Sequence, residues 1–553
     1  MHPDPRGITV EGDLRPPPPI NEPVLDYAPG SAERAVLDET LDRMASEVVD
    51  IPVIVGGEDH LTGDTADVVM PHDHGHVLAR YHKATPELIR AAIETGHEAW
   101  HEWSNWPWPD RAAVFLRAAE LLAGPWRATL NASTMLGQSK TIHQAEIDAA
   151  CEIIDFWRFN VHYARELLTR QPISDAGVWN YTDYRPLEGF VYAISPFNFT
   201  SIGANLPTAP AMLGNVAIWK PARTSLYSSY FLMRLLEEAG LPGGVINFLP
   251  GNSTQISAEL IRSPHLAGIH FTGSTAVFQS LWKDVAANLE NYRSYPRIVG
   301  ETGGKDFIVA HASADVDALV TGMVRGAFEY QGQKCSAASR AYVPASLWPE
   351  VKAKLGEEIA AIRMGDPRDF GNFFCAVIDG AAWSDIKGYI DHARDSDDAE
   401  ILFGGGCSDE KGWFIEPTVI LARDPKFRTM CEEIFGPVLT IHVYEDSDWE
   451  ETLAVVDGTS PYALTGAVFA DDRAAVRQAM AALRHAAGNF YVNDKPTGAV
   501  VGQQPFGGAR ASGTNDKAGS WVNLMRWVSP RSVKETFVPA VDWRYPFLGE
   551  PGS

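Results

Sequence analysis

The pattern of apolar and polar positions changes character along this chain of 553 residues. Between residues 110 and 170, apolar side chains recur at three- and four-residue spacing, as in 147–154, which predicts helices. After residue 190, short β-branched runs recur about every 25 residues, and helical stretches such as 225–239 and 275–289 fill the gaps. Such alternation of strands and helices predicts a parallel, doubly wound sheet.

The predicted strands fall into two sets, which indicates two α/β domains. The first set is 190–194, 216–219, 245–249, 268–271 and 297–299. The second set is 307–310, 340–343, 438–443 and 467–469. We therefore expect an α/β fold with two doubly wound domains that join near Gly303 and Gly304.

Segments outside these sets complete the expected domain division. The aromatic run 178–185 alternates like a strand, and the tail run 533–538 predicts a strand that pairs outside the main body. The first 50 residues combine four consecutive prolines with one predicted helix, 31–50. The expected parts are an N-terminal arm 1–50, a first domain 51–302 without the strand 176–187, a second domain 303–490, a loop and return segment 491–530, and a C-terminal strand segment 531–553.

Composition excludes some classes of partner. The chain carries 46 Lys and Arg against 71 Asp and Glu, a net charge of −25, with a pI near 5.0. General affinity for nucleic acid or an anionic membrane would need a basic surface. The five cysteines form no Cys-x-x-Cys pair, which favours a reducing compartment. The first residues lack an apolar signal core, so we expect a cytoplasmic protein.

Cys335 has flanks that are unusual for a core cysteine. A free cysteine more often packs as a small hydrophobe than acts as a nucleophile. Here, however, the neighbours Gly332, Gln333, Lys334 and Ser336 are polar or flexible. A reactive thiol also needs help to form its thiolate. We interpret Cys335 as a candidate nucleophile and the other four cysteines as structural.

Two further polar groups follow predicted strands. Glu301 comes directly after Val299 and Gly300, at the carboxyl end of a strand, where α/β sheets place their ligands. Asn198 lies between two phenylalanines, and its carboxamide could serve as an oxyanion donor worth roughly 3–4 kcal/mol. The run 300–305 is no Walker A loop, because Val299 stands at the position where that motif requires its first glycine.

A dinucleotide would have to be held by single residues. No Gly-x-Gly-x-x-Gly motif occurs in the chain. Lys220 ends one predicted strand, and Ser274 follows another. We therefore consider these two side chains as candidate cofactor contacts.

These residues carry a specific family resemblance. Six motifs in order resemble the aldehyde dehydrogenase superfamily and cover about residues 70–530: Pro196-Phe197-Asn198, Trp219-Lys220-Pro221, Phe271-Thr272-Gly273-Ser274, Glu301-Thr302-Gly303-Gly304-Lys305, Gly332-Gln333-Lys334-Cys335 and Glu433-Ile434-Phe435-Gly436-Pro437. The resemblance implies that Cys335 attacks an aldehyde and that Asn198 and the Cys335 amide hold the oxyanion. It implies that Glu301 activates the water that hydrolyses the thioester.

The resemblance also implies NAD as the cofactor, bound by the first domain. The implied cofactor-binding residues are Ser195, Phe197, Lys220, Gly273, Ser274, Glu433 and Phe435. Lys220 would bind the adenosine ribose, Ser274 the pyrophosphate and Glu433 the nicotinamide ribose. Many NAD-specific relatives have Glu where this chain has Arg223, and a cation there would not repel a 2′-phosphate, so NADP stays open as an alternative to NAD.

A narrower resemblance concerns the substrate. The runs 149–156, 503–516 and 533–536 resemble superfamily members that oxidise L-glutamate γ-semialdehyde to L-glutamate in proline breakdown. By that resemblance the following residues bind the substrate: Glu152 the ammonium; Ser336, Gly498 and Ala499 the carboxylate; Phe199 and Phe506 the methylene chain. Some relatives have Ser in place of Ala499, so one hydroxyl donor is absent here.

Alternatives and partners follow from the same residues. The chain could oxidise a different semialdehyde, or it could be a silent scaffold or regulator with this fold. The two outlying strands match the family's oligomerisation flap, which implies a homodimer or higher homo-oligomer. A functional link to a separate proline dehydrogenase is expected, and no nucleic-acid or membrane partner. The run His72–His76 contains three imidazoles, but we interpret it as a solvated turn before the strand 77–81 and expect no metal site.

Overall fold

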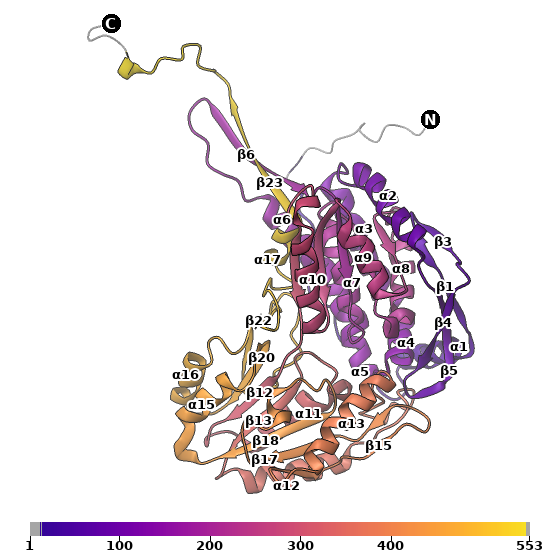
Figure 1. Ribbon diagram of the computed structural model, residues 1–553, viewed down its shortest axis with the longest axis vertical. Helices are drawn as coiled ribbons and strands as arrows, with labels where there is room; N and C mark the ends of the chain where they lie inside the picture. Colours follow the sequence, from indigo (N-terminus) through magenta and orange to yellow (C-terminus); the bar gives the residue numbers. More distant parts are fainter. Residues whose placement is uncertain (1–11, 13, 549–553) are drawn as a thin grey trace.

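A computed structural model describes residue 12 and residues 14–548 of the chain. Figure 1 shows two lobes and a thin two-stranded ribbon that projects away from them. The upper lobe is built mainly from the first half of the chain, and the lower lobe mainly from residues after 300. The remaining residues of the predicted arm and of the predicted C-terminal segment lie outside the described part.

The first lobe is organised around a seven-stranded sheet. Its order is β11 (Arg297–Glu301), β10 (Leu266–Thr272), β7 (Phe190–Ile194), β8 (Val216–Lys220), β9 (Ile246–Phe248), β2 (Val53–Val55) and β3 (Glu58–His60). Strands β7 to β11 are parallel, and β2 and β3 are antiparallel additions. All five strands predicted for this half are confirmed, because each short β-branched run is buried on both faces.

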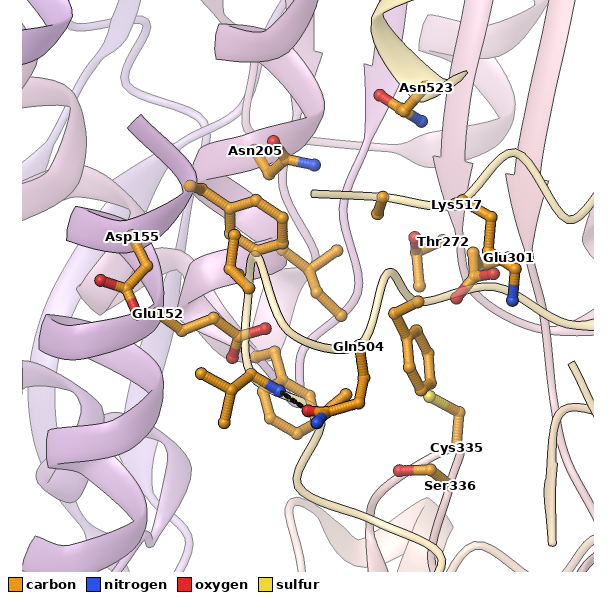
Figure 2. A pocket seen from close by; sticks show the side chains of 18 of the residues that line it. Glu152, Asp155, Asn205, Thr272, Glu301, Cys335, Ser336, Gln504, Lys517 and Asn523 are labelled. Carbon is orange, nitrogen blue, oxygen red and sulfur yellow. Dashed lines mark hydrogen bonds between the residues drawn. The ribbon is translucent and has the colours of Figure 1, made fainter. Parts of the chain in front are cut away.

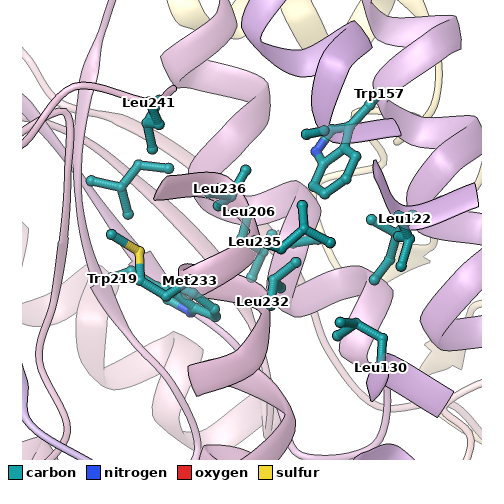
Figure 3. Close-up of a cluster of buried hydrophobic side chains, with 14 of the residues drawn as sticks. Leu122, Leu130, Trp157, Leu206, Trp219, Leu232, Met233, Leu235, Leu236 and Leu241 are labelled. Atoms are coloured by element: carbon teal, nitrogen blue, oxygen red, sulfur yellow. The ribbon is translucent and has the colours of Figure 1, made fainter. Parts of the chain in front are cut away.

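Helices cover both faces of this sheet. They are α2 (Pro86–Trp103), α3 (Trp108–Ala123), α4 (Arg127–Gln138), α5 (Ile142–Ala145), the π-helix η2 (Glu146–Glu152), α6 (Ile153–Leu168), α7 (Thr200–Met212), α8 (Leu226–Glu238), α9 (Ser253–Arg262) and α10 (Thr275–Ala287). One face is filled by a large cluster in which Trp157, Leu206 and Trp219 are buried with leucines of α8 (Figure 3). This packing fixes α6 and α7, which carry substrate-side residues, against the sheet.

The second lobe repeats the architecture. Its seven strands run in the order β14 (Ala399–Phe403), β17 (Thr418–Ala422), β18 (Val438–Tyr444), β13 (Ala338–Pro344), β12 (Asp306–Ala310), β20 (Thr465–Phe469) and β21 (Asn489–Val492). All are parallel except the edge strand β14. The helices are α11 (Val316–Phe328), α12 (Trp348–Ala361), α13 (Gly380–Arg394), α14 (Arg428–Cys431), α15 (Trp449–Gly458) and α16 (Arg473–Ala482). The expected fold of two doubly wound α/β domains is confirmed.

The projecting ribbon joins two distant segments. Strand β6 (Val178–Pro186) pairs antiparallel with β23 (Val528–Thr536) over nine residues. Both strands predicted outside the main body therefore exist and are partners. Smaller elements are β1 (Val49–Ile51), β4 (Thr65–Met70), β5 (Asp73–His82), β15 (Cys407–Ser408), β16 (Phe414–Ile415), β19 (Tyr462–Ala463), β22 (Ala509–Arg510) and α17 (Trp521–Leu524).

Some predicted boundaries differ from the structure. The arm's helix is α1 (Ala32–Ser46), capped by Ser31, and it ends before β1 begins at Val49. The predicted boundary at 50/51 cuts β1, and that at 490/491 cuts β21, because both strands complete sheets with distant partners. The boundary at 302/303 falls between β11 and β12, which belong to different sheets. The domain division as a whole stays a prediction.

The interpretation of His72–His76 as a solvated turn was wrong. Strand β5 begins at Asp73, and His72 is buried, with Nδ1 3.2 Å from Ser139 Oγ and Nε2 3.6 Å from Asp366 Oδ1 of the second lobe. The main chain explains this, because Trp413 N donates to Pro71 O and His74 N to Lys411 O. The segment therefore ties the lobes together. Among the helices that the structure describes, none is long and apolar enough to cross a membrane.

Candidate active site

A cavity of about 400 Å³ holds most of the predicted substrate and catalytic residues. Its lining includes Cys335, Glu301, Glu152, Phe199, Ser336, Gly498, Ala499 and Phe506. In Figure 2 Cys335 lies with Glu301 toward one side, and Glu152 projects from its helix on the other. The predicted nucleophile and the predicted head-group residues thus share one cavity, although they come from distant parts of the chain.

The catalytic side of this cavity lies where strand ends of the two sheets meet. Glu301 ends β11, and its neighbour β10 ends at Thr272, just before Gly273 and Ser274. The next strands, β7 and β8, end at Ile194 and Lys220. Parallel neighbours place their carboxyl ends at one edge, which explains why motifs 25 or so residues apart converge.

The loop before β13 holds Cys335 in an unusual backbone conformation. Tyr330 and Gln331 both have positive φ angles, 52° and 55°. At Gly332, with φ 65°, an added Cβ would lie 2.2 Å from Gly436 O, so only glycine fits. Left-handed non-glycine residues are costly and persist only where the surroundings enforce them. The nucleophile is therefore positioned by a tightly packed turn.

Burial favours the protonated form of the Cys335 thiol. The side chain is only 9% exposed, and desolvation, followed by the charges of Glu301, Asp306 and Glu433, raises the pKa of Cys335 well above its usual range. Burial also raises the pKa of Glu301 to about 7. Its Oε1 accepts a hydrogen bond of 3.1 Å from Gly508 N. A carboxylate with a pKa near neutrality is suited to act as a general base.

Lys517 is a functional candidate that the motif analysis did not single out. It lines the cavity near Glu301 in Figure 2, and its charge lowers the pKa of Glu301. Its Nζ donates to Gly488 O, Asn489 Oδ1 and Gly507 O at 2.8–3.2 Å. The ammonium thus fastens the loop that carries Gly508 beside Glu301. Lys517 directly follows the run 503–516, which carries part of the substrate resemblance.

Asn198 does not point freely into the cavity. Its Nδ2 donates to Gln333 O at 3.0 Å, two residues before the nucleophile, and Asn198 is 3% exposed. This contact ties the end of β7 to the Cys335 loop. An amide NH₂ has two hydrogens, so one remains for an oxyanion.

Glu152 is the last residue of a π-helical turn. The turn η2 inserts between α5 and α6, and π-turns occur often at functional sites. Ser201 Oγ donates to Glu152 Oε2 at 3.0 Å. Burial first, then the charge of Asp148, raises the pKa of Glu152 to about 8. A cationic group placed beside it would favour the carboxylate form.

A buried ion pair supports the turn from behind. Lys140 Nζ donates to Asp148 Oδ2 at 2.7 Å, and both side chains are 1% exposed. Asp148 also accepts from Thr200 N and Ser201 N, which caps the start of α7. The Lys140 ammonium lies 4.2 Å from the centre of the Phe199 ring. The pair therefore fixes both Glu152 and Phe199.

The loop around Gly498 presents unused backbone donors. Gly498 has φ 90°, and within residues 14–548 neither Gly498 N nor Ala499 N finds a hydrogen-bond acceptor. Ser336 Oγ and Thr497 Oγ1 share a hydrogen bond of 2.8 Å. This contact places the hydroxyl next to the nucleophile beside the same loop. The three groups can hold a carboxylate without a buried arginine.

Two features at the strand ends of the first sheet suit a dinucleotide. Lys220 is 7% exposed, yet its Nζ has no acceptor or ion-pair partner among the described residues, and burial lowers the pKa of Lys220 to about 8. Such an orphaned buried ammonium suits ribose hydroxyls. Ser274 caps the 13-residue helix α10, whose N-terminal amides suit a pyrophosphate. Both features fit NAD.

The remaining cofactor candidates lie on both lobes. Glu433 Oε1 accepts from Gly304 N at 2.9 Å, and burial raises the pKa of Glu433 to about 7. The rings of Phe197 and Phe435 meet edge to face with centroids 5.8 Å apart. Ser195 Oγ accepts from Trp219 Nε1 at 2.9 Å, so Ser195 orders the strand end. The cofactor-binding roles of these residues stay predictions.

Arg223, the expected NADP determinant, is already engaged. Its Nη2 lies 2.9 Å from Asp379 Oδ2, although the side chain remains 66% exposed. The Asp379 carboxylate would repel the 2′-phosphate of NADP beside Arg223. In the described part of the chain, no three His, Cys, Asp or Glu side chains gather as potential metal ligands.

Comparison with known proteins decides the family. The model of the aldehyde dehydrogenase family matches residues 59–533. The chain belongs to this family. It is 54% identical to a protein named delta-1-pyrroline-5-carboxylate dehydrogenase, mitochondrial, from Dictyostelium discoideum, over 97% of this chain and 96% of that one. The human protein of the same name is 52% identical, over 96% and 94%.

A solved structure gives the same answer. The delta-pyrroline-5-carboxylate dehydrogenase of Mycobacterium tuberculosis bound with NAD superposes with a TM-score of 0.95 at 54% identity, covering 98% of this chain and all of that chain. The expected resemblance to the aldehyde dehydrogenases is confirmed. The expectation of a cytoplasmic location is contradicted, because the Dictyostelium and human relatives are named as mitochondrial proteins.

Proposed function

We propose that this aldehyde dehydrogenase uses NAD to oxidise L-glutamate γ-semialdehyde, which forms from Δ1-pyrroline-5-carboxylate, to L-glutamate in proline degradation. The observation that supports this choice of substrate is that Cys335 and Glu301 line the same cavity as Glu152 and the Gly498 loop. Relatives at 52–54% identity over nearly the whole chain, named for this activity, support the reading.

The chemistry begins at the nucleophile. Cys335 Sγ attacks the aldehyde carbon, and the oxyanion of the thiohemiacetal accepts from the free N–H of Asn198 and from the Cys335 amide. Since burial raises the pKa of Cys335, the thiol must give up its proton to water when Sγ attacks. Bound NAD would supply the acceptor for the hydride that leaves the same carbon. The substrate is then left as a thioester on Cys335.

Hydrolysis requires Glu301 as the base. Its raised pKa, about 7, lets the carboxylate take a proton from water at neutral pH. The hydroxide adds to the thioester carbon, the carbon–sulfur bond breaks, and L-glutamate leaves. Gly508 N and Lys517 keep Glu301 at its place between the two steps.

The head group is bound at the opposite end of the cavity. Glu152 accepts the α-ammonium, and Ser336 Oγ with Gly498 N and Ala499 N binds the α-carboxylate. Phe199 and Phe506 enclose the methylene chain between them. Lys220, Ser274 and Glu433 would hold the ribose and pyrophosphate groups of NAD, with Phe197 and Phe435 beside the nicotinamide, while Gly273 and Ser195 shape the cleft.

Assembly and supply are further parts of the proposal. The ribbon of β6 and β23 serves as an oligomerisation flap in a homodimer or higher homo-oligomer. The semialdehyde is supplied by a separate enzyme that oxidises proline, with which this chain has a functional link. Sedimentation at several concentrations tests the first statement.

The assay that tests the substrate compares two aldehydes. NADH formation from Δ1-pyrroline-5-carboxylate and from succinate semialdehyde is followed under the same conditions. A clear preference for Δ1-pyrroline-5-carboxylate supports the proposal, because only the semialdehyde that forms from it carries an ammonium for Glu152. Preference for succinate semialdehyde would refute it, and failure to bind NAD in a titration would favour a silent member of the fold.

A further inference from the structure

The described part of the N-terminal arm crosses the substrate cavity. Residues 14–28 form no helix or strand, yet Asn21, Glu22 and Val24 belong to the cavity lining. An irregular segment on a surface is normally poorly anchored. This one is held by an unusual number of polar contacts, so its course over the cavity is specific.

Asn21 makes three hydrogen bonds to two separate elements. Its Nδ2 donates to Asp155 Oδ2 and to Val501 O, both at 2.8 Å. Its Oδ1 accepts from Gln503 Nε2 at 3.0 Å. Asp155 lies on α6, three residues after Glu152, and Val501 follows the Gly498 loop. One amide therefore bridges the two elements that carry the head-group contacts.

The neighbouring arm residues fix Asn21 in place. Glu22 N donates to Asp155 Oδ1 at 2.7 Å, and the Glu22 carboxylate pairs with Arg127 at 2.6 Å and Arg158 at 2.7 Å. Leu25 N donates to Glu146 Oε1 at 2.9 Å, at the start of the π-turn. The arm therefore contacts Glu146 at the start of the turn η2 and Asp155 on α6, which follows that turn.

We infer that Asn21 is a positioning residue that sets the distance between Glu152 and the Gly498 loop, and thereby selects aldehydes with an amino-acid head. The inference rests on the proposed function. The ammonium and carboxylate of an α-amino acid are separated by a fixed, short distance, so their two binding elements must not drift apart. The hydrogen bonds of Val500 with Gln503 and Gln504, all 3.0 Å long, lie within the loop, and Thr497 bonds to Ser336 and not to α6.

The test uses the full chain with Asn21→Ala and Asn21→Asp. Both changes remove the two donated hydrogen bonds, and the second also places a carboxylate against Asp155. We expect KM for the semialdehyde to rise about tenfold in Asn21→Ala, and the Kd of L-glutamate to rise equally, as expected for lost buried hydrogen bonds. The kcat value and the KM of butanal, which lacks the head, stay within about twofold of wild type.

The matched control is Ile20→Ala, because Ile20 is the preceding arm residue and 75% exposed. Ile20→Ala should leave kcat and KM unchanged for both the semialdehyde and butanal. Equal loss for butanal and semialdehyde in Asn21→Ala, together with a lower melting temperature, would mean a merely structural role and overturn the inference. An unchanged KM and glutamate Kd would also overturn it, while the proposed function would survive. Wild-type enzyme that oxidises butanal but not the semialdehyde would overturn both.

Discussion

The two ends of the cavity are built in different ways. At the nucleophile end, Glu301 and the Cys335 loop lie at strand ends of two sheets, and backbone amides such as those of Gly304 and Gly508 hold the carboxylates of Glu433 and Glu301 in place. At the head-group end, a π-turn, an irregular loop and the arm meet, and they are joined by contacts more than 100 residues apart in sequence. The first end supplies chemistry common to aldehydes, and the second supplies the selection among them.

This difference predicts that changes at the nucleophile end abolish activity on every aldehyde. Replacing the nucleophile, Cys335→Ser, should lower turnover at least about 10⁴-fold with both butanal and the semialdehyde, because the hydroxyl is a far weaker nucleophile. NADH formation measures it, with Cys431→Ser as the control for loss of a thiol. Substantial activity on either aldehyde would disprove the thioester route.

Glu301→Gln should separate the two chemical steps. Acylation of Cys335 continues, so one NADH per active site forms in a burst, while steady turnover falls roughly 10²–10⁴-fold. In the wild type, kcat should rise as pH increases through about 7, since only the deprotonated Glu301 can act as base. Rapid mixing detects the burst. Absence of a burst would place Glu301 in the first step instead.

Glu152→Gln should affect only the substrate with an ammonium. We expect kcat/KM for the semialdehyde to fall roughly 30–100-fold, since a buried charge partner is lost, and that for butanal to stay nearly unchanged. In the wild type, KM for the semialdehyde should fall as pH rises through about 8, where Glu152 becomes charged. The variant should lose that pH dependence. Equal losses of kcat/KM for the two aldehydes would mean that the head-group end of the cavity does not select the substrate.

The smallest expected effect is a gain. Ala499→Ser adds one hydroxyl donor to the loop that binds the carboxylate. A net hydrogen bond of about 1 kcal/mol would lower KM for the semialdehyde about fivefold and leave butanal unaffected. A rise in KM would indicate that the loop has no room for the hydroxyl beside Ser336.

The same contrast explains what the sequence could predict. The nine strands predicted for the two sheets lie within about two residues of observed strands, because buried parallel strands are short β-branched runs with helices between them. The other strands of the two sheets, β2, β3, β14, β17 and β21, were not predicted. The strand-end residues Glu301 and Lys220 followed from the same pattern. The π-turn before Glu152, the bond from Asn198 to Gln333 and the bridge by Asn21 have no periodic signature. They depend on contacts between segments far apart in sequence, which no local pattern encodes.

Trapping the covalent intermediate tests most directly whether Cys335 carries the reaction and Glu152 selects the substrate. Glu301→Gln enzyme is mixed with NAD and Δ1-pyrroline-5-carboxylate, quenched and digested, and the peptides are analysed by mass spectrometry. We expect a glutamyl group on Cys335, and much slower formation of that adduct when Glu152→Gln is added, while the adduct from butanal still forms. No adduct, an adduct on another of the five cysteines, or an adduct that forms equally fast without Glu152 would contradict it.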